Sequence, residues 1–229
     1  MNKVKTEKLI HQLVTETQPI KPLAPPLNRF FKWVVFAFVY FTVAVYFIGA
    51  RPIPIETITH PAFLFQIILI LSLVLTAAIS VFFLTIPNKQ SVWLFLAPIA
   101  LLMVWTASIA IPLFSHGDIH AGAGLKCLRN ILIVGMPPGV FLFYMLRRTV
   151  ILNLRTVGFL FILTTTAVGC LGTRFICRNE DPLHFLIWHY MPVILSGSLG
   201  ALTAHVVLLK DYLGPHIKAM QSNMERYRK

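Results

Sequence analysis

Long runs without a charged side chain dominate this chain. Six such runs contain no Lys, Arg, Asp or Glu, and they cover residues 33–50, 57–88, 90–117, 130–146, 156–173 and 182–209. A helix needs about 20 consecutive apolar residues to cross a hydrocarbon layer about 30 Å thick, and most of the six runs are close to that length. The pattern therefore predicts six membrane-spanning helices joined by short polar segments.

The composition agrees with a lipid environment. Of the 229 residues, 57% are apolar and only 12% are charged, whereas soluble domains carry about 25% charged residues. So few charges cannot cover the hydrophobic surface of a soluble fold, which excludes a soluble globular protein. We expect an all-α integral membrane protein: a six-helix bundle with a short cytoplasmic amphipathic helix before it and no independent second domain.

The cations are distributed unevenly between the two sides that six spans create. If the N-terminus, the segments around Lys89 and Arg147, and the C-terminal tail share one side, that side holds 15 of the 20 Lys and Arg residues. Loops rich in Lys and Arg stay in the cytoplasm. We therefore expect both termini on the cytoplasmic side of a bacterial inner membrane. The net charge of +12 follows from this topology, and we expect no direct contact with nucleic acid.

Residues 1–32 are predicted to form a cytoplasmic binding segment. Within residues 4–17, an amphipathic helix carries one apolar stripe, formed by Leu9, Ile10, Leu13 and Val14. A spacer follows, in which prolines favour an extended chain of about 3 Å per residue: Pro19, Pro22, Pro25 and Pro26. An apolar stripe with nothing local to cover it favours docking into the groove of a partner. The alternative is a helix on the membrane surface, with Lys3, Lys5 and Lys8 at anionic headgroups.

Residues 33–209 are expected to form the six-span domain, and residues 210–229 a basic cytoplasmic tail. Arg29, Lys32 and Trp33 are the residue types that gather at the headgroup layer before a first span. Pro137 and Pro138 remove two backbone donors from span four and are expected to kink it. Spans five and six carry small residues that allow close helix packing, among them Gly158, Gly169, Gly172, Ser196, Gly197 and Gly200.

Several functional classes lack their usual sequence features. No charged side chain lies at mid-membrane depth in any span, although such residues are typical of pumps and ion-coupled transporters. The chain has no glycine-rich phosphate loop, no His-Glu-x-x-His helix and no Gly-x-Ser-x-Gly turn. We therefore expect a protein that is not an enzyme and that holds no cofactor.

Thiol and imidazole groups gather toward the outer face of this topology. Cys127 begins span four, Cys177 precedes span six, and Cys170 lies about one turn deeper in span five. Five of the eight histidines fall toward the same face: His60, His116, His120, His184 and His189. Polar residues also collect in loops without any function, and the cysteines also suit a structural disulfide or buried packing.

Three motifs make the chain similar to NrsF-type membrane anti-sigma factors over residues 9–209. The first runs Ile10-x-x-Leu13, Glu16-Thr17-x-Pro19-Ile20-x-Pro22-Leu23-x-Pro25-Pro26-x-x-Arg29. The second is Cys127-x-x-Asn130 before Gly135-Met136-Pro137-Pro138, and the third is Cys177-x-x-x-Asp181-Pro182 before Trp188-His189-x-x-Pro192. The resemblance implies a six-span inner-membrane protein that holds an extracytoplasmic-function (ECF) sigma factor inactive. It also implies that Cys127 and Cys177 take part in the stress response. Cys170 and the basic tail lie outside the motifs.

We therefore predict an anti-sigma factor whose segment up to Arg29 binds the sigma factor and whose cysteine pair senses an envelope-side signal. Two modes stay open: a disulfide between the thiols, or a thiophilic cation bound with help from Asp181, His184 or His189, the last as a supporting group. The other functional classes are a membrane thiol oxidoreductase, which the absence of Cys-x-x-Cys disfavours, and a small transporter or haem-binding protein.

Overall fold

The computed structural model describes residues 7, 11, 24–52, 60–86, 89–115, 124–147, 149 and 151–204. The predicted amphipathic helix lies outside the described residues except for Glu7 and His11, which are helical and exposed. The spacer before residue 24, the loop that holds His116 and His120, and the tail from residue 205 also lie outside them. The predictions made for those segments remain predictions.

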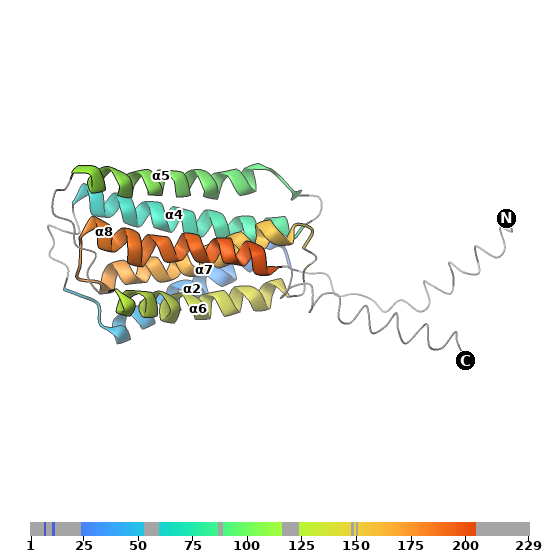
Figure 1. The fold of residues 1–229 in the computed structure, drawn as a ribbon. Coiled ribbons are helices and arrows are strands. Elements are labelled where there is room, and N and C mark those ends of the chain that lie inside the picture. Colours follow the sequence, from blue (N-terminus) through green and yellow to red (C-terminus); the bar gives the residue numbers. More distant parts are fainter. Residues whose placement is uncertain are drawn as a thin grey trace, which may run out of the picture.

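Six long helices run side by side in one bundle (Figure 1). Their bounds are Pro26–Ile48 (α2), Pro61–Leu84 (α4), Trp93–Ser115 (α5), Leu125–Leu146 (α6), Leu154–Ile176 (α7) and Pro182–Ala204. The last helix begins as α8 (Pro182–Phe185), passes through a π-helical turn, η2 (Leu186–Tyr190), and continues as an α-helix to Ala204. All six helices are long and apolar enough to cross a membrane, and the described residues include no strand. The predicted fold class is confirmed.

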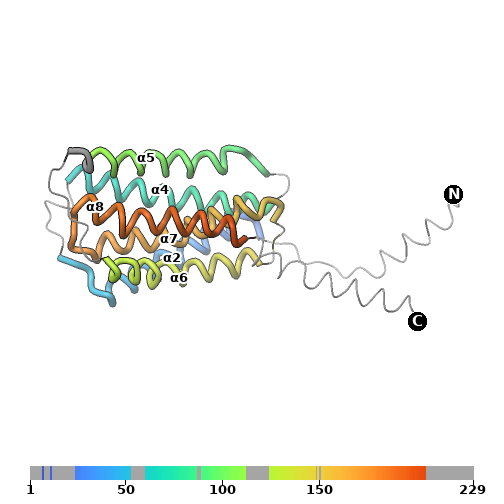
Figure 2. Tube along the Cα trace, viewed as in Figure 1, coloured from blue at the N-terminus to red at the C-terminus, as the bar shows by residue number. Residues whose placement is uncertain are grey.

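The chain alternates in direction, so the start of α2 and the end of the sixth helix lie at one end of the bundle (Figure 2). The end of α7 and the start of α6 lie at the other end. Helices α4 and α7 are the most deeply buried, whereas α2 and α5 leave most of their surface to lipid. The exposed face of α2 is accordingly apolar and includes Phe38 and Phe47.

Helix α6 continues as an α-helix through Pro137 and Pro138, and α2 supplies side-chain donors to its backbone near them. Pro137 has no N–H, so the carbonyl oxygen of Ile133, four residues earlier, lacks its usual helical donor. The hydroxyl of Tyr40 donates to that oxygen at 2.9 Å, and the indole Nε1–H of Trp33 donates to the carbonyl oxygen of Pro138 at 2.9 Å. These two bonds fix the register of α2 against α6.

Helix α2 begins at Pro26, earlier than the charge-free run that starts at Trp33. Proline is well suited to the first helical position, because its missing N–H would have no partner there. Arg29 is buried, donates to the carbonyl oxygen of Met145 at 2.7 Å and lies over the ring of Phe82. The end of the proline-rich spacer is thus the first turn of a membrane helix that is bonded to the end of α6.

Glycines bring neighbouring helices into backbone contact. A Cβ on Gly169 of α7 would lie 2.1 Å from the carbonyl oxygen of Ile131 in α6. Gly158 of α7 and Gly200 of the sixth helix meet similarly, since a Cβ on either would lie 2.5 Å from the carbonyl oxygen of the other. The close approach expected from small residues in spans five and six is present.

We expect Gly169→Ala to destabilise the bundle by about 1–3 kcal/mol, because the added methyl group meets a backbone that cannot rotate away. The unfolding midpoint of the purified protein in detergent, followed by helical circular dichroism, measures this change. Gly197→Ala is the matched control, since its Cβ would first meet a side-chain carbon of Phe159 at 3.3 Å. Equal midpoints for the two variants would show that α6 and α7 are not in backbone contact at Gly169.

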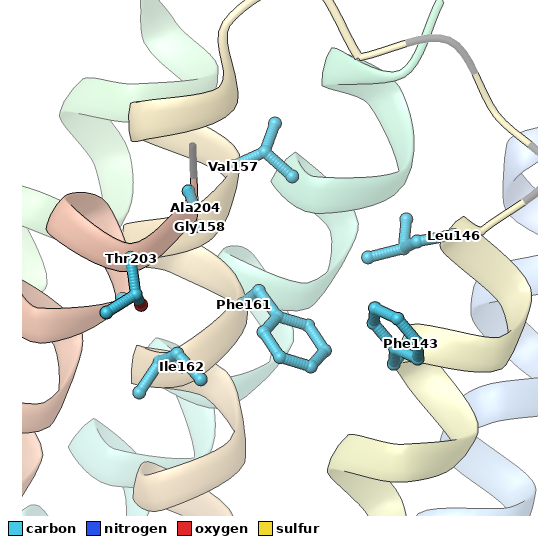
Figure 3. Close-up of a pocket in the computed structure, with 9 residues that line it drawn as sticks. Phe143, Leu146, Val157, Gly158, Phe161, Ile162, Thr203 and Ala204 are labelled. Carbon is cyan, nitrogen blue, oxygen red and sulfur yellow. The ribbon is translucent and has the colours of Figure 1, made fainter. Parts of the chain in front are cut away.

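A small apolar cavity lies between α6, α7 and the sixth helix, near the α6–α7 connection (Figure 3). Its lining includes Phe143, Leu146, Val157, Phe161 and Thr203. These side chains offer almost no polar surface and lie toward the end of the bundle opposite the start of α6. The cavity is therefore separate from Cys127, which lies in the first turn of α6.

Candidate functional site

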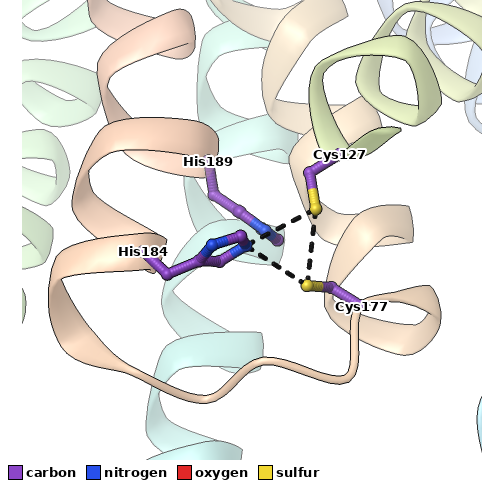
Figure 4. A group of neighbouring side chains, drawn as sticks. All are labelled: Cys127, Cys177, His184 and His189. Carbon is purple, nitrogen blue, oxygen red and sulfur yellow. Dashed lines mark hydrogen bonds between the residues drawn. The ribbon is translucent and has the colours of Figure 1, made fainter. Parts of the chain in front are cut away.

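Four side chains meet where α6 begins and α7 ends: Cys127, Cys177, His184 and His189 (Figure 4). One donor atom from each of them lies within 4.8 Å of all the others. The two Sγ atoms are 3.4 Å apart, and Nε2 of His184 is 3.5 Å from each sulfur. The structure therefore brings together both predicted sensing cysteines and both predicted histidines.

Cys127 is held by the first turn of α6. Its backbone N–H donates to the carbonyl oxygen of Gly124, the residue before the helix, at 2.9 Å. A Cβ on Gly124 would lie 2.0 Å from Cγ of Trp188, so the indole of the sixth helix packs directly on this glycine. The sixth helix and the start of α6 are thereby locked together beside the cluster.

Cys177 is held by the turn that joins α7 to α8. Its N–H donates to the carbonyl oxygen of Thr173 at 2.8 Å and caps α7. The side chain of Asn179 accepts a hydrogen bond from the N–H of Asp181 at 2.8 Å. The carboxylate of Asp181 then accepts from the N–H of Leu183 at 2.9 Å, which caps α8. These hydrogen bonds reverse the direction of the chain between α7 and α8, so that His184 lies beside Cys177.

The π-helical turn η2 brings His189 into the cluster. Residues five apart in an α-helix point about 140° away from each other around the axis. Here the N–H of Met191 bonds to the carbonyl oxygen of Leu186, five residues earlier, so the turn is wider than an α-turn. The rings of His184 and His189 consequently lie 5.5 Å apart, measured between centroids. Such single π-turns occur often at functional sites.

His189 is buried beside the cysteines, and among the described residues no hydrogen-bond partner lies in bonding geometry with its ring nitrogens. Its side chain is 1% exposed, and neither ring nitrogen has a partner within the described part of the chain. A buried polar group left unpaired costs about 1–3 kcal/mol. The other cluster residues are also buried or half-buried, so the site is largely closed to water. A ligand that bound His189 would remove this cost.

One carboxylate, that of Glu180, bridges two arginines next to the cluster. Glu180 forms ion pairs with Arg51 and with Arg174, the latter at 3.2 Å. The guanidinium of Arg174 lies between the rings of Phe63 and Phe185, about 5 Å from each centroid. The pairing stabilises the α7–α8 turn that carries Cys177, and the three side chains together keep a net charge of +1.

The thiol of Cys177, in the turn outside the membrane-spanning helices, has a perturbed pKa. The hydrogen bond with the Cys127 thiol is the largest cause and lowers the pKa of Cys177 well below its usual range, although burial acts in the opposite direction. The site therefore favours one thiolate at Cys177. A thiolate is the form that attacks disulfides and binds metal ions.

The remaining predicted site residues lie apart from this cluster. Asp181 caps α8 through its carboxylate, and Cys170 is fully buried within α7. Pro25 and Pro26 form the start of α2, and Arg29 bonds to α6. The other residues predicted to bind the sigma factor lie outside the described residues: Leu9, Ile10, Leu13, Val14, Pro19 and Pro22.

From the sequence, His189 was a possible ligand but was favoured as a supporting group, because in a regular α-helix it lies about 7–8 Å into span six. No periodicity in residues 182–204 indicates the wider turn. The packing of Trp188 on Gly124 was also missed. The only sequence sign of both features is the Trp188-His189 pair that follows Pro182.

Comparison with known families identifies the family of this chain. The family model for NrsF, described as a negative regulator of sigma F, matches residues 13–209. The chain belongs to the NrsF family. No curated protein and no solved structure matches it. As an NrsF-family protein, the chain is a negative regulator of a sigma factor, and its six apolar helices make it a multi-pass membrane protein. The resemblance based on the cysteine and proline motifs is confirmed.

Proposed function

We propose that this chain is an inner-membrane anti-sigma factor that binds an ECF sigma factor in the cytoplasm and releases it in response to envelope stress. The observation that carries the proposal is the pairing of Cys127 and Cys177, from different helices, with two histidines at one end of the bundle. The regulatory assignment comes from the NrsF family. Sensing by the cysteine pair is the additional step that we propose.

The orientation follows from the distribution of cations. With 15 of the 20 Lys and Arg residues on one side, the positive-inside rule places both termini in the cytoplasm. Because α2 begins at the opposite end of the bundle from the cluster, Cys127 and Cys177 then face the envelope. A signal received there has to cross the membrane through the helices.

Helix α6 is suited to carry that signal. It runs without a break from Cys127 in its first turn to Leu146 at its other end. There the carbonyl oxygen of Met145 accepts the hydrogen bond from Arg29, in the turn of α2 that directly follows the proline-rich segment. A shift of α6 against α7 would therefore move the first turn of α2, which connects the bundle to the sigma-binding segment. Bundles of packed helices change state by such small shifts.

The N-terminal segment is proposed to act by masking the sigma factor. Its apolar stripe, with Leu9 and Leu13 at its centre, would occupy a groove on the sigma factor and block the surface needed for polymerase. Residues 19–25 would hold this helix away from the membrane. No chemistry is required of this segment, which agrees with a regulator rather than an enzyme.

Co-purification tests the proposal. The tagged full chain is solubilised from membranes of its host and captured, and bound proteins are identified by mass spectrometry. We expect one small sigma factor to be enriched with the chain and absent from a capture of an unrelated six-span protein. The captures are made from unstressed cells, which contain the sigma factor in its inactive state. If repeated captures from these cells contain no sigma factor, the proposal is refuted.

A further inference from the structure

We infer that Cys127, Cys177, His184 and His189 together bind one soft divalent cation, Zn²⁺ or Cd²⁺, in a four-coordinate site. This inference deepens the proposed function, on which its regulatory meaning rests, because it identifies the chemical class of the signal. In this site, His184 and His189 are both direct ligands of the cation. The binding itself can be measured without any sigma factor.

The distances in the cluster match a tetrahedral site. Bond lengths of about 2.3 Å to sulfur and about 2.0–2.1 Å to nitrogen place two tetrahedral sulfur ligands about 3.8 Å apart, and a sulfur and a nitrogen about 3.6 Å apart. The observed separations are 3.4 Å between the sulfurs and 3.5 Å from each sulfur to Nε2 of His184. The ligand atom of His189 lies within 4.8 Å of the other three.

The donor set also selects the ion. Two sulfur and two imidazole nitrogen donors suit zinc-group cations, whereas Mg²⁺ and Ca²⁺ require oxygen ligands. In the occupied site the divalent ion is balanced by two thiolates, and the two imidazoles are neutral, so the site has no net charge. Neutrality matters here because the cluster is largely shielded from water and an unpaired charge there would be costly.

His189 distinguishes this inference from simple disulfide formation. In a disulfide, the two thiols lose two electrons and two protons to an oxidant, and neither histidine takes part. Yet His189 is 1% exposed, is brought to the sulfurs by the π-helical turn, and has two ring nitrogens without partners in the described part of the chain. A bound cation gives this imidazole a partner, which a disulfide does not.

Cobalt titration of the purified, reduced full chain in detergent tests the inference. We expect one Co²⁺ per chain, with visible absorption bands of tetrahedral intensity and a thiolate-to-cobalt charge-transfer band in the near ultraviolet. Added Cd²⁺ or Zn²⁺ should displace the cobalt and remove both signals. Cys127→Ser combined with Cys177→Ser should abolish the charge-transfer band.

The histidines are tested by loss and rescue. His184→Ala and His189→Ala should each weaken binding at least ~10-fold. His189→Cys should restore tight binding and strengthen the charge-transfer band, a result that a purely structural role for His189 cannot produce. Cys170→Ser and His60→Ala are matched controls and should bind as the unchanged chain does, since Cys170 is buried in α7 and His60 is exposed before α4.

Two results would overturn the inference: no saturable cobalt or cadmium binding by the folded, reduced chain, or undiminished affinity in His189→Ala and His184→Ala. Neither result touches the proposed function, which is tested by capture of the sigma factor. If thiol-dependent induction persisted without metal binding, the cysteine pair would work by oxidation. If the ion bound while no sigma factor was captured, the site would stand and the proposed function would fail.

Discussion

Replacing Cys127 and Cys177 together by serine is expected to abolish induction of the partner sigma factor by cadmium and by a thiol oxidant, with repression intact. A serine hydroxyl neither forms a disulfide nor binds soft cations well, while its size leaves the packing of α6 and α7 almost unchanged. A transcriptional reporter for the sigma factor, at equal membrane levels of each variant, measures the response. Output should stay at the uninduced level after either challenge.

Cys170→Ser is the matched control for this pair. Its side chain is fully buried in α7 and outside the cluster, so induction should be normal. His189→Ala separates the two modes of sensing, because it should impair the response to cadmium and leave the response to the oxidant. Normal induction in the double serine variant would remove the cysteines from the sensing mechanism, and loss in Cys170→Ser alone would show that another thiol is the sensor.

Replacing Leu9 and Leu13 by aspartate is expected to release the sigma factor and express its regulon without stress. Burial of each leucine in a groove contributes about 1.5–3 kcal/mol, so loss of both corresponds to at least ~100-fold weaker binding. The same reporter and the amount of sigma factor captured with the membrane protein measure this effect. The variant must first be shown to reach the membrane at the normal level.

Gln12→Asp combined with Thr15→Asp provides the control for the added charge. Both positions lie on the predicted polar side of the same helix, away from the stripe formed by Leu9 and Leu13. Repression should therefore be retained in this control. If Leu9→Asp with Leu13→Asp also repressed normally, the helix would not be the binding element, and its position on the membrane surface would become the better explanation.

The helices of the fold could be predicted because lipid imposes a strong rule on sequence. Every membrane span must exclude charge for about 20 residues, and residues 57–88 and 130–146 show this plainly. The first boundary was harder to place. Lys32 ends the charge-free run, yet Lys32 and Arg29 both lie within α2, and the guanidinium of Arg29 donates to the carbonyl oxygen of Met145. A paired charge breaks the pattern without ending the helix.

The part of the site that could be predicted is the set of residues that the order of the spans places at one end of the bundle. Cys127 and Cys177 were placed at the same membrane depth by the order of the spans, and His184 follows them in the next turn. The contribution of His189 depends on the π-helical turn η2, in which a backbone hydrogen bond spans five residues and beside which Trp188 packs on Gly124. Periodicity in a single sequence cannot show a local change in helical pitch.

Regulation through the cluster is tested most directly by release of the sigma factor from the captured complex. The purified complex is immobilised through the membrane protein, treated with Cd²⁺ or with a thiol oxidant, and washed, and the sigma factor in the eluate is measured. We expect at least one of the two treatments to release the sigma factor from the unchanged chain, and neither to release it from the variant that carries Cys127→Ser and Cys177→Ser. Retention through both treatments, or equal release from the serine variant, would contradict regulation through Cys127 and Cys177.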